Sequence, residues 1–210
     1  MLVLARHGQS RANAAGLLVG RADSPLTDLG RRQAEALGVV LAPITRAGCR
    51  ILSSPLQRAE QTAHAVALGG AIQPAQSSSG SRVITDGRFV ELDYGELDQT
   101  AISELASGLW DNWRANTTWR PPGGETLAEV MARVTAVCEE LAEEAARADV
   151  VIVSHVSPIK AAVAWALGAG PELTWRLSLG VASVTRIATD RARGPSLVSF
   201  NERSHLAGLC

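Results

Sequence analysis

Short hydrophobic runs alternate along the chain with segments in which hydrophobic positions recur every three or four residues. Short runs rich in hydrophobic residues predict strands, which we expect at residues 2–5, 50–54, 149–155, 181–189 and 196–200. The most hydrophobic run, 149–155, is typical of a central parallel strand. The segments with helical spacing predict amphipathic helices, which we expect over residues 25–42, 54–67, 126–147 and 157–167. Because strands and helices alternate, the pattern predicts an α/β fold of three layers, in which helices cover both faces of a mostly parallel sheet.

Polar residues mark the starts of the predicted helices. Thr27, Ser54 and Ser157 each stand at the beginning of a helical segment and suit an N-cap. Thr126 is followed three residues later by Glu129, which is the spacing of a capping box. Two of these helix starts come directly after predicted strands, so they are expected at the carboxyl end of the sheet.

One segment, residues 76–124, departs from the alternation of strands and helices. It contains a polar loop at 76–81, a half-extended stretch at 88–97 and a tryptophan-rich stretch at 98–120. We expect this segment to form a small irregular or helical cap, with its tryptophans packing the cap. The chain has no internal repeat, so residues 1–210 are expected to form a single domain.

Composition narrows the classes of function. The formal net charge is −1, and the lack of a basic excess argues against a nucleic-acid-binding protein. Cys49, Cys138 and Cys210 show no CxxC spacing, so neither a disulfide framework nor a zinc site is expected. No hydrophobic run approaches the length of a membrane span. We therefore expect a cytoplasmic protein without membrane contact, metal or cofactor; its oligomeric state stays open, with a homodimer as one alternative.

Charged side chains stand where three of the predicted strands end. Arg6 and His7 follow the first strand, His155 ends the most hydrophobic strand, and Arg58 lies in the first turn of the helix after the second strand. The carboxyl ends of parallel strands meet at one edge of the sheet, where α/β proteins bind ligands. Two arginines, two histidines and nearby helix N-termini would therefore converge around an anion, and a tetrahedral phosphoryl group suits two arginine forks.

These residue types suit phosphoryl transfer. Neighbouring cations lower the pKa of a histidine and keep it neutral, so one histidine can act as a nucleophile. The other cationic groups would stabilise the charge of the transition state, and no metal is required. The leaving oxygen still needs a proton donor. Glu91 is the candidate, although Asp93, Glu96 and Asp98 lie close to it in the sequence.

The stretch LARHGQSRAN at residues 4–13 resembles the signature of the histidine phosphatase superfamily, the phosphoglycerate-mutase-like proteins. That signature is Arg-His-Gly, then Glu or Gln, then Thr or Ser, with an Asn three residues further on. Other blocks resemble the family in the same order along the chain, at residues 20–34, 53–63, 91–97, 121–126, 153–155 and 200–206. An ordered set of blocks is far more specific than one motif alone.

The resemblance implies a role for each matching residue. It implies that His7 becomes a phosphohistidine and that Glu91 donates and then accepts the proton. It also implies that the phosphoryl group is held by residues from several loops, namely Arg6, Asn13, Gly20, Arg58 and His155. One departure is Val156, which stands where the family usually has glycine. A branched side chain at this position would narrow the pocket or shift His155.

Three activities are compatible with such a site. Mutases that resemble this chain carry adjacent arginines after the acid glutamate for the substrate carboxylate. Residues 91–121 hold only Arg114 and Arg120 and are otherwise acidic, which does not suit an anion-gripping lid. We therefore expect a phosphatase that acts on a small phosphorylated metabolite, with a mutase as the alternative. A catalytically silent relative that binds phosphorylated ligands or a partner protein is a third reading, but it would be expected to have lost one of the phosphoryl-binding residues.

Overall fold

The computed structural model describes residues 1–46, 48–69, 83–106, 108–116, 118–190 and 192–209. Within these ranges six strands form one sheet in the order β3-β2-β4-β1-β5-β6. The strands are β1 (Leu2–Arg6), β2 (Arg50–Ser53), β3 (Val83–Thr85), β4 (Val150–Ser154), β5 (Val184–Asp190) and β6 (Gly194–Glu202). The first four strands are parallel, whereas β5 pairs antiparallel with both β1 and β6. The predicted mostly parallel sheet is therefore confirmed.

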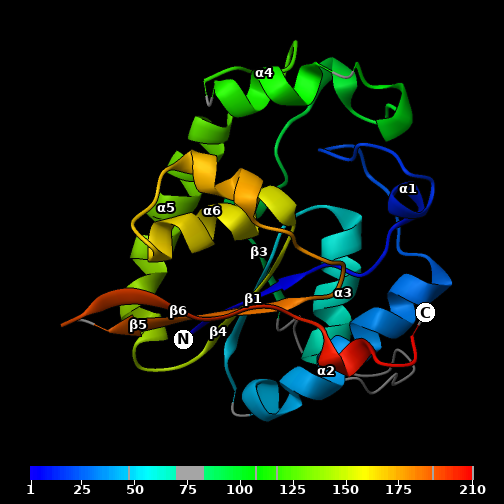
Figure 1. Ribbon diagram of the computed structural model, residues 1–210. Coiled ribbons are helices and arrows are strands. Elements are labelled where there is room, and N and C mark those ends of the chain that lie inside the picture. The colour runs from blue at the N-terminus through cyan, green and yellow to red at the C-terminus, as the bar shows by residue number, and fades with distance from the viewer. Residues whose placement is uncertain (47, 70–82, 107, 117, 191, 210) are drawn as a thin grey trace.

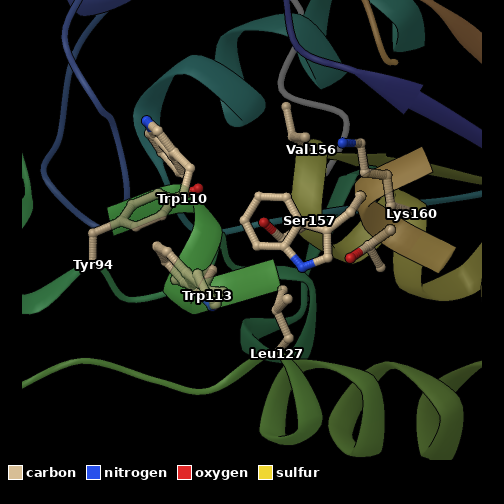
Figure 2. Close-up of a pocket in the computed structure, with 10 residues that line it drawn as sticks. Tyr94, Trp110, Trp113, Leu127, Val156, Ser157 and Lys160 are labelled. Carbon is tan, nitrogen blue, oxygen red and sulfur yellow. The ribbon is translucent and has the colours of Figure 1, made fainter. Parts of the chain in front are cut away.

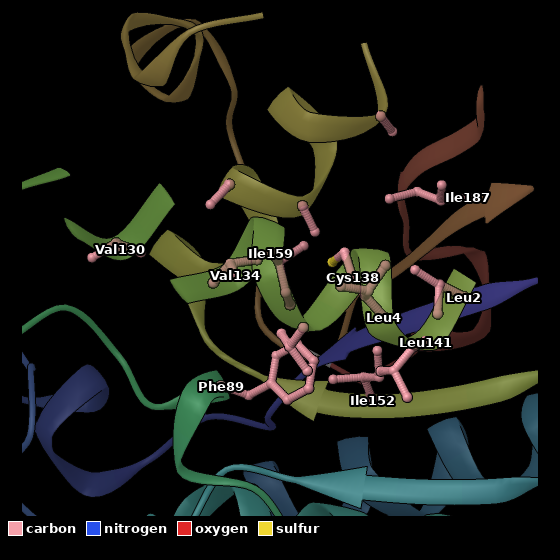
Figure 3. Close-up of a cluster of buried hydrophobic side chains, with 14 of the residues drawn as sticks. Leu2, Leu4, Phe89, Val130, Val134, Cys138, Leu141, Ile152, Ile159 and Ile187 are labelled. Carbon is pink, nitrogen blue, oxygen red and sulfur yellow. The ribbon is translucent and has the colours of Figure 1, made fainter. Parts of the chain in front are cut away.

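Helices cover both faces of the sheet, as predicted (Figure 1). One face packs against α2 (Asp28–Arg46) and α3 (Gln57–Ala67), and the other against α5 (Leu127–Ala145) and α6 (Val156–Ala166). Successive side chains of a strand point to opposite faces. Leu2 and Leu4 accordingly join the cluster with α5 and α6, whereas Val3 and Ala5 join the cluster with α2 and α3. Figure 3 shows the first cluster, in which Phe89 packs beneath α5 and α6.

The register of the parallel strands aligns the strand ends that carry the candidate residues. Arg6 at the end of β1 pairs with Ser154 at the end of β4, and Ser53 at the end of β2 pairs with Val153. His7, His155 and the beginning of α3 therefore leave the sheet at the same edge. This is the edge at which α/β proteins bind ligands.

The chain between β3 and α5 forms the predicted cap (Figure 1). It consists of short helices, namely η1 (Gly87–Phe89), η2 (Gly95–Leu97), η3 (Ile102–Glu104) and α4 (Leu109–Ala115). Trp113 is buried in the cap, and its ring stacks on that of Trp110 at a centroid distance of 6.0 Å. Trp113 thus packs within the cap as predicted, but Trp110 and Trp113 also line the pocket described below. The polar loop predicted at 76–81 lies outside the described residues.

Two of the four predicted helix caps are confirmed and two are wrong. Thr27 caps α2, because its hydroxyl accepts from the Gly30 N–H at 2.9 Å. Ser157 does not cap α6, because that helix begins at Val156 and His155 holds the N-cap position.

Thr126 and Glu129 form the expected capping box, in which each side chain accepts a hydrogen bond from the backbone N–H of the other residue. Ser54 does not cap α3, because the helix begins at Gln57, whose N–H donates to Asp23 at 2.8 Å. The Ser54 hydroxyl has a different partner in the site described below.

Three further short helices complete the described chain. They are α1 (Arg11–Ala14), η4 (Pro171–Arg176) and η5 (Ser204–Leu206). Helix α1 follows the end of β1 closely, and η4 lies beside α6. No helix in the described part of the chain is long and apolar enough to cross a membrane.

Candidate active site

His7 lies directly after β1 and is almost completely buried. Its Nδ1 atom is 2.7 Å from the carbonyl oxygen of Gly8. A carbonyl oxygen can only accept a hydrogen bond, so this contact assigns the proton to Nδ1. In the neutral ring the lone pair is then on Nε2, the atom that can act as a nucleophile.

Gly8 has a steric reason to be glycine. A Cβ atom built at this position would lie 2.3 Å from the carbonyl oxygen of Gly30 in α2. The Gly8 N–H also donates to the hydroxyl of Thr62 in α3 at 3.1 Å. The loop that carries His7 is therefore held between α2 and α3, which fixes the position of the imidazole.

His155 is the second histidine of the site. It is fully buried, and it occupies the N-cap position of α6. Its Nε2 atom is 2.7 Å from the Ser54 hydroxyl, while its Nδ1 atom has no hydrogen-bond partner within the described chain. The centroids of the His7 and His155 rings are 5.0 Å apart. The structure therefore brings the two predicted histidines together, and it adds Ser54, which the sequence suggested only as a helix cap.

Arg58 projects from the first turn of α3 and is 1% exposed. Its guanidinium group donates to the carbonyl oxygens of Gly20 at 2.7 Å and Ala22 at 3.0 Å. Arg6 donates to the carbonyl oxygen of Leu179 at 2.6 Å. Within the described residues neither arginine forms an ion pair with a carboxylate, and the Nε atoms of both lack a partner. Both cations are thus held by neutral groups and keep their charge available for an anion.

Glu91 is buried beside this cationic group. Its carboxylate accepts hydrogen bonds from the backbone N–H groups of Leu92 at 2.8 Å, Val156 at 3.0 Å and Ser157 at 3.1 Å. Two of these donors belong to the first turn of α6, where the helix dipole stabilises a negative charge. The structure therefore places Glu91 at the site, as predicted. It places Asp98 in a different role, as a partner of the loop at Gly20.

Burial and neighbouring charge determine the protonation of the site. Burial, followed by the charges of Arg6 and Arg58, holds the pKa of His7 well below its ordinary value. Burial, followed by His7 and Arg58, does the same to the pKa of His155. Burial lowers the pKa of Arg6 to about 10, which still leaves it charged at neutral pH. The site thus combines two neutral imidazoles with two guanidinium cations.

Asn13 and Gly20 each have part of their hydrogen-bonding capacity already used, and only Gly20 has a recorded contact with one of the two arginines in the described structure. The Asn13 side-chain oxygen accepts from the N–H and hydroxyl of Ser10, which leaves its amide N–H groups for a ligand. The Gly20 N–H donates to Asp98 at 2.8 Å, and its carbonyl accepts from Arg58. The backbone of Gly20 therefore supports Arg58.

A pocket of about 80 Å³ adjoins Glu91 (Figure 2). Tyr94, Trp110 and Trp113 form its aromatic walls, and α6 contributes Val156 and Lys160. The branched side chain of Val156 thus occupies the pocket wall. Tyr94 was not predicted as a site residue; its phenol is hydrogen-bonded to the Ser157 side chain. Within the described residues, no group of three or more His, Cys, Asp or Glu side chains is arranged to hold a metal ion.

Comparison with known proteins agrees with this geometry. Residues 2–203 match the model of the histidine phosphatase superfamily, branch 1. The chain is 35% identical over 210 residues to a bifunctional protein of Mycobacterium tuberculosis, covering 98% of this chain and 54% of that protein, so it spans about half of that relative's length. It is 32% identical over 201 residues to the probable phosphoglycerate mutase of Yersinia enterocolitica, covering 93% of this chain and 87% of that protein.

The fold is also similar to that of solved structures. The structure of mycobacterial glucosyl-3-phosphoglycerate phosphatase in complex with VO3 superposes with a TM-score of 0.80 and 29% sequence identity, covering 96% of this chain and 98% of that chain. The family match therefore extends over nearly the whole chain and includes the strand ends that carry the two histidines and two arginines. The chain belongs to the histidine phosphatase superfamily.

Proposed function

We propose that this protein hydrolyses phosphomonoesters through a phosphohistidine on His7, without a metal ion. The observation that carries the proposal is the arrangement around His7. A neutral imidazole with its proton on Nδ1 lies among Arg6, Arg58 and His155, and the two guanidinium groups have no carboxylate partner in the described structure. A phosphoryl group supplies the negative charge that this arrangement lacks.

In the first step, Nε2 of His7 attacks phosphorus and the bond from phosphorus to the ester oxygen breaks. Glu91 in its protonated form gives its proton to the leaving alcohol. Arg6, Arg58 and His155 hold the oxygens of the transferring group, whose charge is spread over them in the transition state. The products of this step are the free alcohol, the phosphohistidine and the Glu91 carboxylate.

In the second step, water attacks the phosphohistidine. The Glu91 carboxylate takes a proton from the water, the phosphorus–nitrogen bond breaks, and His7 returns to its neutral form with phosphate as the product. Three backbone N–H groups stabilise the Glu91 carboxylate, which is the form that this step requires. Protons and charges are thus restored after each cycle.

The position of the cap arginines favours hydrolysis over a mutase reaction. Arg114 pairs with Asp111 at 3.4 Å and Arg120 pairs with Glu129 at 2.8 Å, and all four side chains are largely exposed. Neither arginine lines the pocket beside Glu91, so neither is placed there to retain an anionic intermediate for re-phosphorylation.

The test is a steady-state assay with p-nitrophenyl phosphate, with and without a chelator. We expect turnover that the chelator leaves unchanged and that His7→Ala abolishes. Conversion of 3-phosphoglycerate to 2-phosphoglycerate with little release of phosphate would establish the mutase instead. Binding of phosphate without any turnover would support a catalytically silent relative.

We further propose that residues 1–210 act as one catalytic domain on a small phosphorylated metabolite in the cytoplasm. The two hydrophobic clusters lie on the two faces of one sheet, which supports a single folding unit. Cys49 and Cys138 are free thiols, as expected in a reducing compartment. Cell fractionation would test the location, and gel filtration would test whether a homodimer forms.

A further inference from the structure

Lys160 is the single lysine of the chain, and it lines the pocket beside Glu91. It lies on α6 one turn after Val156, so both side chains face the pocket (Figure 2). Lys160 is half-buried, and no hydrogen bond or ion pair joins its ammonium group to another described residue. A half-buried ammonium group without a partner lowers the stability of the folded protein, and a bound anion would offset that loss.

The other unpartnered polar groups in the pocket wall are also donors. The indole N–H groups of Trp113 and Trp175 are buried without an acceptor in the described part of the chain. The Thr174 hydroxyl already donates to the Pro171 carbonyl at 2.7 Å, and the Glu91 oxygens already accept from the backbone. The pocket therefore presents one positive charge, that of Lys160, whereas the two indole N–H groups are closed off from it by their own burial.

Building on the proposed function, we infer that this pocket holds the alcohol part of the substrate and that Lys160 pairs with a carboxylate on it. A single cation matches a single negative charge, whereas the transferring phosphoryl group has two arginines of its own. A volume of about 80 Å³ suits a short carboxylated chain. The substrate class is accordingly a small phosphomonoester with a carboxylate close to the ester oxygen.

The surroundings of Lys160 agree with this role. Burial lowers the pKa of Lys160, with an opposing contribution from Glu91 and a further lowering by Arg6. A carboxylate bound in the pocket would favour the charged ammonium form. Arg114 and Arg120 do not line this pocket, and Lys160 is the cation among its described lining residues.

The test compares two ligands that differ by one group, 3-phosphoglycerate with a carboxylate and glycerol 3-phosphate with a hydroxymethyl. Binding is measured by calorimetry in the His7→Ala protein, so the result does not depend on turnover. We expect 3-phosphoglycerate to bind about tenfold or more tightly than glycerol 3-phosphate. Adding Lys160→Met should bring the two dissociation constants to within about twofold, whereas Lys160→Arg should keep most of the difference.

Arg176→Met is the matched control, because Arg176 is an exposed cation on the neighbouring η4. This variant should keep the preference for 3-phosphoglycerate. The inference would be overturned if His7→Ala bound both ligands with the same dissociation constant. It would also be overturned if the preference for 3-phosphoglycerate were unchanged after Lys160→Met. Failure of the unaltered protein to hydrolyse p-nitrophenyl phosphate would instead overturn the proposed function, so the two failures are distinguishable.

Discussion

Asp98 and Arg58 bind the same short loop from opposite sides. The two carboxylate oxygens of Asp98 accept from the N–H groups of Gly20 at 2.8 Å and Ala22 at 2.7 Å. The guanidinium group of Arg58 donates to the carbonyl oxygens of the same two residues. Asp98 lies in the cap and Arg58 on α3, so this loop connects the cap to a cation of the active site.

This relationship predicts that Asp98→Asn weakens catalysis without unfolding the protein. An amide can accept from one of the two N–H groups but presents its own N–H₂ to the other, so the loop and Arg58 should shift. We expect kcat/KM for p-nitrophenyl phosphate to fall about tenfold, equivalent to about 1.4 kcal/mol. Glu96→Gln, an exposed change on η2, is the control and should leave kcat/KM unchanged. Similar activities in the two variants would exclude this positioning role.

Glu91→Gln should separate the two chemical steps. A nitrophenolate leaves without a proton, so the first step with p-nitrophenyl phosphate should continue, whereas attack by water lacks its base. We expect a burst of nitrophenolate stoichiometric with the enzyme, followed by a steady state slower by about a hundredfold. An alkyl phosphate should show no burst, because its leaving oxygen needs the proton. Rapid-quench kinetics measures product release from the nitrophenyl and the alkyl phosphate. A burst with the alkyl ester would argue against Glu91 as the proton donor to the leaving oxygen.

Phosphate should stabilise the folded protein through the two arginines. At about a hundred times its dissociation constant, inorganic phosphate should raise the free energy of unfolding by about 2.7 kcal/mol. Arg58→Lys should lose most of this gain, because an ammonium group cannot bond to both carbonyls and to phosphate in the geometry of a guanidinium. Urea unfolding with and without phosphate provides the measurement. An equal rise in the free energy of unfolding for the wild-type and Arg58→Lys proteins would show that phosphate binds away from Arg58.

The buried histidines should make stability depend on pH. Because the pKa values of His7 and His155 are lowered in the folded protein, the unfolded chain binds more protons as the pH falls below about 6.5. The free energy of unfolding should therefore decrease from about pH 7 to about pH 5, by up to about 1.4 kcal/mol per pH unit for each histidine. Urea titrations without phosphate should show a shallower decrease for His7→Gln. Parallel curves for the two proteins would contradict the burial of a neutral His7.

The convergence of the site was predictable from the sequence because its main residues stand next to strong local signals. Arg6, His7 and His155 follow apolar strands, and Arg58 lies in the first turn of a helix that follows another strand. The order of parallel strands then brings them to one edge. The alternation of the β1 side chains between two hydrophobic clusters was also predictable, because backbone geometry fixes the two-residue period of a strand.

Other features depend on tertiary contacts that leave no periodic signal. Strand β3 is three residues long, and Ile84 within it is 48% exposed, so nothing in its pattern distinguishes it from a loop. The support of Arg58 by Gly20 uses backbone carbonyls, which every residue has. Ser54 carried a cap signal, but its hydroxyl pairs with His155, 101 positions away. Such pairings follow from the fold and cannot be read from spacing.

The most direct test of His7 as the nucleophile is to identify the residue that becomes phosphorylated. The enzyme is mixed with p-nitrophenyl phosphate, quenched in base during the burst, digested and mapped by mass spectrometry. We predict a phosphoryl group on His7 that acid removes and base preserves, and none in the His7→Ala protein. Turnover by His7→Ala, or a phosphoryl group on another residue of the wild-type protein, would contradict the assignment of His7 as the nucleophile.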